Sequence, residues 1–499
     1  MSDYLLNYHS VNTNTWVYLS SLLMIGLFFK FGRFWSVRNL DLVLLIFLAP
    51  GLLLVHHGQL ELRKELQVKQ IQAEANKKKA IASKGKGRKD KGNGKQQSNK
   101  QITNKKEIKT EDKDKDPKGQ SAGLDDAPFR PKDSDGRRLT RGGYIWVLVV
   151  SGLFLGRLLA DSTMVRRPLL DPNLSTGGLI FLGCSLFVFL MANLIGSPGE
   201  PNRFRVDGAD GTSTVQRQGP GYAILDYFPP IRTFVGGERT PSQMRAANET
   251  AAKILAIASH LAIVMGMVVI GFRHFENTKM GLGAALIYLM LPYTAQMTGR
   301  VDHVLPAAML VWAVVSYRHP IGAGIFIGLA TGMVYYPLFL LPLWISFYWR
   351  RGVWQFVIGL VATLALMAMI LAFVSNDLRA FGENIQQMFG LWRPAMEGLQ
   401  GVWGLGWSPF YRLPVLALFF VLSGTLAMWP AQKNLGTLLC CSAAVMVAIQ
   451  FWHGFGGGLY MAWYLPLTLL TIFRPNLEDR VALSVLGEGW FPNRRAAAG

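Results

Sequence analysis

Three ionisable side chains, Arg300, Asp302 and His303, fall within four residues of each other, in a turn between two apolar segments. An arginine can hold a phosphate through two parallel hydrogen bonds, and a carboxylate or an imidazole can accept a proton. Ionisable groups at the edge of a membrane segment often mark a functional site. An ordinary turn with a solvated ion pair is the competing interpretation, because surface ion pairs are common and weak.

A second polar and aromatic group lies in the stretch 375–412. Its candidate ligands are Trp392, Arg393, Trp403 and Trp407. Aromatic faces can stack on sugar rings, and the arginine could bind a phosphate. An aromatic belt at the membrane surface would give the same composition. Farther along the chain, His453 precedes a run of glycines, where an imidazole could orient a hydroxyl group or a phosphate.

Two more carboxylates, Asp161 and Asp171, flank the sequence Arg166-Arg167-Pro168. If this loop is extracytoplasmic, either carboxylate could act as a general base toward an acceptor hydroxyl group. If the loop is cytoplasmic, the arginines only mark the topology and both aspartates are bystanders. The sequence leaves both interpretations open.

Several kinds of site have no signature in this sequence. It contains no phosphate-binding loop, nucleotide fingerprint, zinc motif or serine-hydrolase elbow. Its three cysteines, Cys184, Cys440 and Cys441, lie in apolar segments and predict neither a disulfide framework nor a metal site. We therefore expect no cofactor, while the participation of a metal ion stays open. No basic region precedes the first apolar segment, so we expect no cleaved signal peptide.

The elements that must position these residues are membrane helices. Apolar residues gather in blocks of about 16 to 25, the length of helix that crosses a bilayer. These blocks are 16–31, 42–56, 144–160, 178–195, 252–272, 280–297, 303–317, 321–348, 353–374, 413–429, 435–451 and 459–473. Uninterrupted apolar blocks favour helices over alternating barrel strands. The sequence predicts an all-α, polytopic membrane bundle of about 10–13 transmembrane or half-membrane helices.

The polar segments divide the chain into regions. We predict a transmembrane hairpin (1–60), a disordered Lys-rich linker (61–142), a multi-pass domain (143–475, with polar loops 197–250 and 375–412) and a tail (476–499). The linker holds 24 Lys and Arg against 13 Asp and Glu. Such a segment beside a membrane most often contacts anionic lipid headgroups, so we expect membrane lipids and no nucleic acid as its partner.

The block 321–348 decides the orientation of the chain. It is too long for one ordinary span, and Pro337 within it disfavours a continuous helix. If the block forms two short helices folded back, the short basic loops gather on one side, which the charge rule makes cytoplasmic. These are the loops with Arg273, Lys279, Arg318, Arg350, Arg351 and Lys433, together with the C-terminal tail. The turn at Arg300, the stretch 375–412 and the loop at His453 then share the other side.

The linker does not follow this order. Counting spans back from the Arg300 turn places it outside, against the charge rule, although long loops cross membranes largely regardless of charge. Alternatively, the block 144–160, which contains Arg157, lies at the interface without crossing. We favour a cytoplasmic linker.

The stretch 286–352 resembles the central region of GT-C glycosyltransferases, in particular the mannosyltransferases that use polyprenyl-phosphate mannose. The resemblance is carried by Leu291-Pro292, Gly299-Arg300-Val301-Asp302-His303, Tyr317-Arg318-His319-Pro320, the Gly-rich run 324–330, Tyr335-Tyr336-Pro337 and Arg350-Arg351-Gly352. Two positions depart from the family pattern: Arg300 replaces a glutamine, and Val334-Tyr335-Tyr336 stands where a lysine often precedes the proline.

This resemblance implies an inner (plasma) membrane enzyme that moves a sugar from a polyprenyl phosphate to a lipid or envelope-glycan acceptor on the extracytoplasmic side. It implies Asp161, or alternatively Asp171, as the base. Arg300 and Arg393 would bind the donor phosphate, beside the polar cluster of Asp302, His303 and His453. Trp392, Trp403 and Trp407 would line the acceptor groove. The rival hypotheses are a non-catalytic scaffold and a transporter or flippase for a lipid-linked substrate.

Overall fold

The computed structural model describes residues 13–89, 134–163, 169–197, 225, 246–349, 351–375, 377–389, 399, 401–430, 433–454 and 459–475. Regular structure in these ranges is helical, without strands, so the predicted fold class is confirmed. Seven helices are long and apolar enough to cross a membrane: Val37–Leu62, Asp135–Leu159, Thr176–Gly196, Asn248–Arg273, Val353–Phe373, Pro409–Met428 and Leu435–Trp452. The chain is therefore a multi-pass membrane protein.

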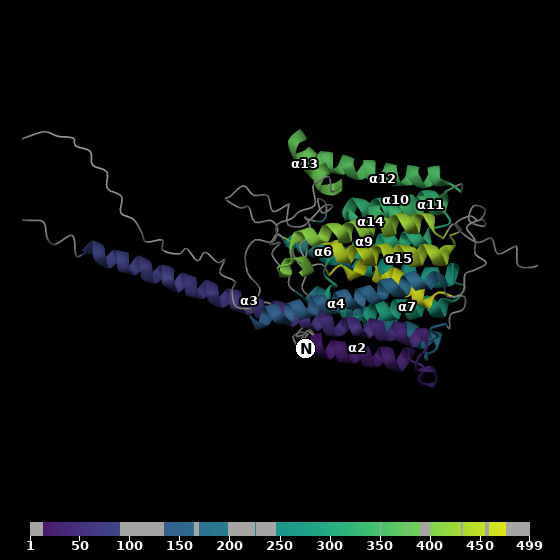
Figure 1. Cartoon of the computed structure of the whole chain (residues 1–499), viewed down its shortest axis with the longest axis horizontal. Coiled ribbons are helices and arrows are strands. Elements are labelled where there is room, and N and C mark those ends of the chain that lie inside the picture. The colour runs from purple at the N-terminus through teal and green to yellow at the C-terminus, as the bar shows by residue number, and fades with distance from the viewer. Residues whose placement is uncertain are drawn as a thin grey trace, which may run out of the picture. The chain divides into compact units, whose positions relative to one another are not determined.

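The chain forms two compact units. Unit 1 comprises Met1–Leu54 and Arg141–Gly499, and unit 2 comprises Val55–Thr140. The helices of unit 1 and those that enter it are α2 (Thr13–Phe28), α3 (Val37–Lys89), α4 (Asp135–Leu159), α5 (Thr176–Gly196), α6 (Ala246–Arg273), α7 (Thr278–Met290), α8 (Pro292–Gln296), α9 (Val301–Val315), α10 (Pro320–Met333), α11 (Leu341–Tyr348), α12 (Val353–Val374), α13 (Leu378–Phe389), α14 (Arg412–Met428), α15 (Leu435–Trp452) and α16 (Leu465–Phe473). Many of them run side by side (Figure 1).

In unit 2, α3 continues to Lys89. The first part of the predicted disordered linker, from residue 61 to 89, is thus helical, because its Ala, Lys, Glu and Gln residues are strong helix formers. Gly58 of α3 lies against Thr140 and Gly136 of α4, where a side chain would find no room. Residues 90–133 lie outside the described ranges, as does nearly all of the predicted loop 197–250.

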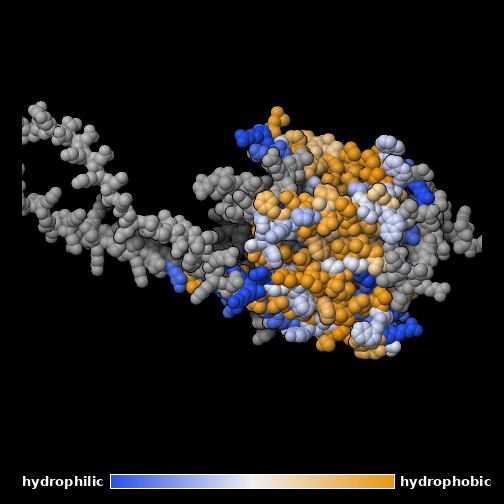
Figure 2. Space-filling view, viewed as in Figure 1, coloured by the Kyte–Doolittle hydropathy of each residue, from blue (hydrophilic) through white to orange (hydrophobic). Residues whose placement is uncertain are grey.

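The long helices of unit 1 run side by side, so their termini form two ends (Figure 1). At the Asp302 end, α9 begins beside the turn that precedes α16, because the Trp463 indole donates to the Asp302 carbonyl at 3.3 Å. At the Arg474 end, α16 finishes beside the end of α4. Hydrophobic residues cover the middle of unit 1, between hydrophilic residues toward the two ends (Figure 2).

The block around Pro337 folds back on itself, which confirms the predicted break. The helix α10 stops at Met333, and a 3-10 turn over Tyr336–Leu340 leads into α11. Pro337 has no N–H to donate and sterically disfavours a preceding helical turn, so the chain reverses there. The hydroxyl of Tyr348, the last residue of α11, donates to the Tyr317 carbonyl at 2.6 Å, which returns the chain to the end where α10 began.

Basic residues of the short loops gather at the Arg474 end, as the folded-back arrangement predicts. Among the described residues at this end are Lys30, Arg33, Arg38, Arg273, Lys279, Arg318, Arg351, Lys433 and Arg474. Contacts that join these loops include His274 with the Val315 carbonyl at 2.9 Å and the Lys433 ammonium with Ser346 at 3.1 Å.

Both flanks of the linker leave unit 1 at the Asp302 end. The helix α3 starts beside Asp171 at the Arg474 end and has run about 24 Å by Leu54. Arg141 of α4 stacks over Trp407, 5.8 Å from its ring centroid, at the Asp302 end. From there α4 runs to the Arg474 end, where Arg157 and Arg474 share the Asp161 carboxylate, so the block 144–160 lies along the bundle and not across one end of it. A cytoplasmic linker and an extracytoplasmic Asp302 turn are therefore incompatible.

Candidate functional site

The candidate site is centred on an ion pair at the start of α9. Arg300 precedes the helix and binds both carboxylate oxygens of Asp302, with Nε 2.9 Å from Oδ1 and a terminal nitrogen 2.7 Å from Oδ2. Asp302 lies in the first helical turn, where the helix dipole favours a negative charge. The Arg300 and Asp302 side chains are 26% and 17% exposed, so this pair is accessible while its neighbours are buried.

His303, the next residue, is enclosed by aromatic rings. Its Nδ1 lies 2.6 Å from the hydroxyl of Tyr293, which follows the Leu291-Pro292 break before α8. The Tyr460 ring lies 4.4 Å from the imidazole, measured between centroids, and Trp463 stacks on Tyr460 at 4.3 Å. Large buried rings leave the imidazole little freedom to rotate, so its orientation is fixed in advance of any ligand.

A second histidine extends the cluster. His453 caps the end of α15, and its ring lies 4.6 Å from Tyr336 and 4.7 Å from Tyr460. Arg412, at the start of α14, donates to the Trp452 carbonyl at 3.1 Å. Burial, followed by the nearby positive charge of Arg412 and the proximity of His303, lowers the pKa of His453 to about 3. His453 is therefore neutral at physiological pH.

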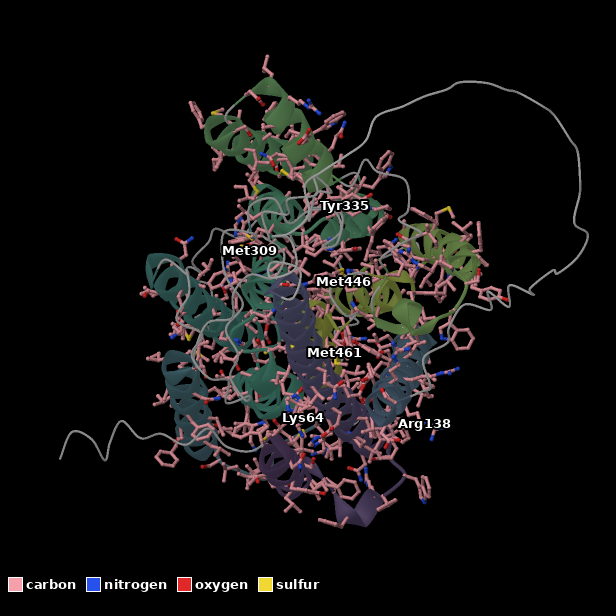
Figure 3. All side chains as sticks on the ribbon, turned by 90° about the vertical axis from the view of Figure 1, so that its left-hand side faces the viewer. Lys64, Arg138, Met309, Tyr335, Met446 and Met461 are labelled. Atoms are coloured by element: carbon pink, nitrogen blue, oxygen red, sulfur yellow. The ribbon has the colours of Figure 1, made fainter. Side chains whose placement is uncertain are left out.

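Figure 3 looks onto the Asp302 end of unit 1. Met461, the neighbour of Tyr460, lies near the middle of the bundle in this view, and Tyr335, the neighbour of Tyr336, lies above it. Tyr293 and His303 come from α8 and the first turn of α9, Tyr336 from the 3-10 turn after α10, and His453 and Tyr460 from the segment between α15 and α16. Ring contacts of Tyr336 and Tyr460 with His453, and of Tyr460 with His303, join these segments, which are distant in sequence.

The site does not lie at the outer end of the bundle, because the N-terminal half of α6 extends past it. His260 of α6 reaches the Thr298 carbonyl at 3.1 Å, so the turn containing Arg300 is level with His260. From Arg273 to His260, α6 rises about 20 Å, and it continues to Ala246 for about 21 Å more. If Arg273 marks one boundary of a hydrocarbon core about 30 Å thick, the turn lies about 10 Å short of the other boundary.

The structure does not bring Asp161 to this site. The Asp161 carboxylate is paired with Arg157 at 3.0 Å and Arg474 at 2.6 Å, and its side chain is 1% exposed. Arg474 lies over Gly436 in the first turn of α15, whereas His453 caps the last turn of the same helix. This 18-residue helix separates the two groups by about 27 Å. Asp161 has no common pocket with Arg300.

The buried charges around Asp161 form a network of their own. Arg157 also binds Asp41 of α3, with its Nε 2.7 Å from Oδ1, so two carboxylates and two guanidinium groups join α3, α4 and the end of α16. Beside it, α4, α14 and α15 enclose a cavity of about 250 Å³ whose lining is almost entirely carbon. Such a network holds helices together; its carboxylates already have their partners.

The other predicted site residues are divided between the two ends. Asp171 pairs with Lys279 at 2.9 Å, at the Arg474 end. Trp403 and Trp407 lie at the Asp302 end, where the Trp403 indole donates to the Phe451 carbonyl at 3.0 Å and Trp407 is 45% exposed. Trp392 and Arg393 lie outside the described residues.

The aromatic members of the cluster were not predicted as site residues. Tyr293, Tyr336, Tyr460 and Trp463 are each close to a proline or to the run of glycines after His453, where the chain turns between helices. A buried tyrosine needs a partner for its hydroxyl, so a tyrosine at such a turn is the available signal. No group of three or more His, Cys, Asp or Glu among the described residues could hold a metal ion.

Acidification tests the burial of His453. Its pKa is lowered on folding, so the unfolded chain binds a proton that the folded chain excludes as the pH falls from about 6.5 toward 3. Stability is full above this window and decreases within it by up to about 1.4 kcal/mol per pH unit. Thermal unfolding of His453→Gln in detergent should show a shallower loss between pH 6 and 4 than the unsubstituted protein. The exposed His57→Gln is the control, and an equal slope for all three proteins would contradict the prediction.

Comparisons with known protein families, with characterised proteins and with solved structures give no match to this chain.

Proposed function

We propose that this protein is a membrane glycosyltransferase of GT-C type. It moves a sugar from a polyprenyl phosphate to a hydroxyl group of a lipid or glycan acceptor, on the extracytoplasmic face of the plasma (inner) membrane. The observation that carries the proposal is the Arg300–Asp302 pair, which stays partly exposed at a level within the bilayer and beside the buried His303. Accessible charges at that depth suit a substrate whose phosphate is attached to a lipid.

In this proposal Asp302, and not Asp161, is the carboxylate beside the reacting sugar, where its role is electrostatic. The Arg300 guanidinium keeps the Asp302 carboxylate ionised and, with Arg393, attracts the donor phosphate. The acceptor oxygen forms a bond to the anomeric carbon while its proton passes to a basic side chain of the site. The bond from that carbon to the phosphate oxygen breaks, and the phosphate leaves with the electron pair. The carboxylate stabilises the positive charge that develops near the sugar ring. Trp403 and Trp407 offer faces for the acceptor sugar.

Substitution of Asp302 tests the activity. In membrane vesicles that contain the full chain and radiolabelled polyprenyl-phosphate mannose, Asp302→Asn should lower the rate of sugar transfer by about 10²–10³-fold, because it removes a charge that stabilises the transition state. Arg300→Gln should raise the donor concentration required for half-maximal rate. Glu383→Gln removes an exposed carboxylate of α13 at the same end and should leave the rate unchanged. Transfer that is equal in Asp302→Asn and Glu383→Gln would refute this assignment.

The proposed orientation is tested separately. The basic loops of the Arg474 end are cytoplasmic by the charge rule, so the Asp302 end and both flanks of the linker are extracytoplasmic. In a chain with Cys184→Ser, a membrane-impermeant maleimide should label Asp377→Cys in intact cells and label Arg33→Cys only after the cells are opened. Both positions are exposed. Labelling in the reverse order would place the site on the cytoplasmic side and reject the extracytoplasmic reaction.

A further inference from the structure

The proton on the His303 ring can be assigned from its neighbours. The Tyr293 hydroxyl lies 2.6 Å from His303 Nδ1 and 2.9 Å from the Leu459 carbonyl oxygen. A phenol has one proton to donate, and a carbonyl oxygen can only accept. Both contacts are hydrogen bonds only if the hydroxyl donates to Leu459 and accepts from Nδ1–H. In the neutral imidazole, the lone pair is then on Nε2.

This Nε2 has no hydrogen-bond partner among the described residues, although it is completely buried. The atom Oδ2 of Asp302 lies 3.6 Å away, and it too can only accept while the carboxylate is ionised. Oδ2 already accepts from Arg300, so the Nε2 lone pair alone is left without a donor in this part of the chain, and a buried acceptor rarely stays in that state. A ligand that supplies one hydrogen-bond donor would satisfy it.

His260 shows the opposite arrangement on the neighbouring helix. Its Nε2 donates to the Thr298 carbonyl at 3.1 Å, and its Nδ1 accepts from the Tyr288 hydroxyl at 2.8 Å. Both nitrogen atoms of His260 are satisfied, so it needs no ligand. A tyrosine–histidine pair thus satisfies both ring nitrogens at His260, whereas the corresponding pair at His303 leaves Nε2 without a hydrogen-bond donor in the described part of the chain.

We propose that His303 is the proton acceptor of the transfer reaction and that Tyr293 is the residue that positions it; this inference rests on the proposed function. A hydroxyl group of the acceptor sugar or lipid donates to Nε2. As the acceptor oxygen bonds to the anomeric carbon, its proton moves to Nε2, and the electron pair of the broken bond leaves with the donor phosphate. The imidazolium is stabilised by Asp302 beside it, and the partly exposed carboxylate passes the proton to water.

The tautomer can be measured without any activity. In the full chain labelled with ¹⁵N-histidine, the signals that disappear in His303→Gln belong to His303, and they should show a protonated Nδ1 and a bare Nε2. Tyr293→Phe should move the proton to Nε2 or mix the two tautomers. Tyr288→Phe, the matched change at His260, should leave the His303 signals unchanged. Octyl α-mannoside, used as a hydroxyl-bearing probe, should shift the Nε2 signal. An Nε2–H tautomer in the unsubstituted protein, or no shift with the mannoside, would overturn the proposal.

Transfer assays then separate this inference from the proposed function. His303→Gln should lower transfer by at least about 100-fold, because glutamine can donate to Tyr293 but has no basic nitrogen. Tyr293→Phe should shift the acidic limb of the rate–pH profile, which a purely structural role would not do. Transfer that survives His303→Gln rejects His303 as the acceptor and leaves the transferase standing. No transfer in any variant, together with the expected tautomer and mannoside shift, rejects the transferase and retains the hydroxyl-binding site.

Discussion

Replacement of Asp161 by alanine should destabilise the protein by about 3–5 kcal/mol, the usual effect of removing one partner from a buried ion pair. The change leaves two buried guanidinium groups, Arg157 and Arg474, with the single carboxylate of Asp41. Thermal unfolding in detergent, or the yield of folded protein from membranes, would measure the loss. A catalytic base would behave differently, because its removal abolishes activity while the fold persists.

A matched carboxylate supplies the control for this result. Asp171 is also in an ion pair at the Arg474 end, but its side chain is 52% exposed, so Asp171→Ala should change the stability by no more than about 1 kcal/mol. The double change Asp161→Leu and Arg474→Met removes both charges and should recover part of the loss. If Asp161→Ala were as stable as Asp171→Ala, the network would not hold α3, α4 and α16 together.

Substitution of Gly324 by alanine should prevent the close packing of α10 on α12. A Cβ atom at this position would overlap the backbone carbonyl of Phe356, and one at Gly359 would overlap that of Ile321. Backbone atoms cannot move aside as a flexible side chain can, so we expect the upper part of the usual overpacking range of about 1–3 kcal/mol. Unfolding of the variant in detergent would show this loss.

Gly322 of the same helix is the matched control. A Cβ atom there would make an ordinary contact of 3.4 Å with Ser316. The gain in helix propensity from glycine to alanine, up to about 1 kcal/mol, then has nothing to oppose it. Gly322→Ala should therefore stabilise the protein while Gly324→Ala destabilises it. Effects of the same sign at both positions would mean that α10 and α12 do not pack through these glycines.

The fold could largely be predicted because the bilayer imposes one rule on every apolar segment. Each predicted apolar block contains a helix, and the break at Pro337 is where two short helices reverse. Helix propensity also explains one feature that was not predicted, the extension of α3 into the linker. The helix α3 continues far past the apolar block because Lys, Glu and Ala extend it, although hydropathy gives no sign of this.

The site was harder to predict, since its members meet only through the order of the helices. The Arg300–Asp302–His303 turn was visible because its residues are adjacent. Asp161 was misleading as a candidate base: a carboxylate in a loop looks the same in sequence whether it faces a substrate or two arginines. Its partner Arg474 is 313 positions away, and sequence spacing gives no indication of that contact.

The pairing of Asp41 with Arg157 has a consequence for how the protein is made. Their codons are separated by 116 positions, and the long linker accounts for most of that interval. At about 5–20 residues per second, a ribosome needs roughly 6–23 s to pass from one to the other. Throughout this interval α3 has been synthesised and Arg157 has not, so the ion pair cannot yet form. Shortening the linker would shorten this interval, so the linker length sets the earliest moment at which α3 and α4 can form this ion pair.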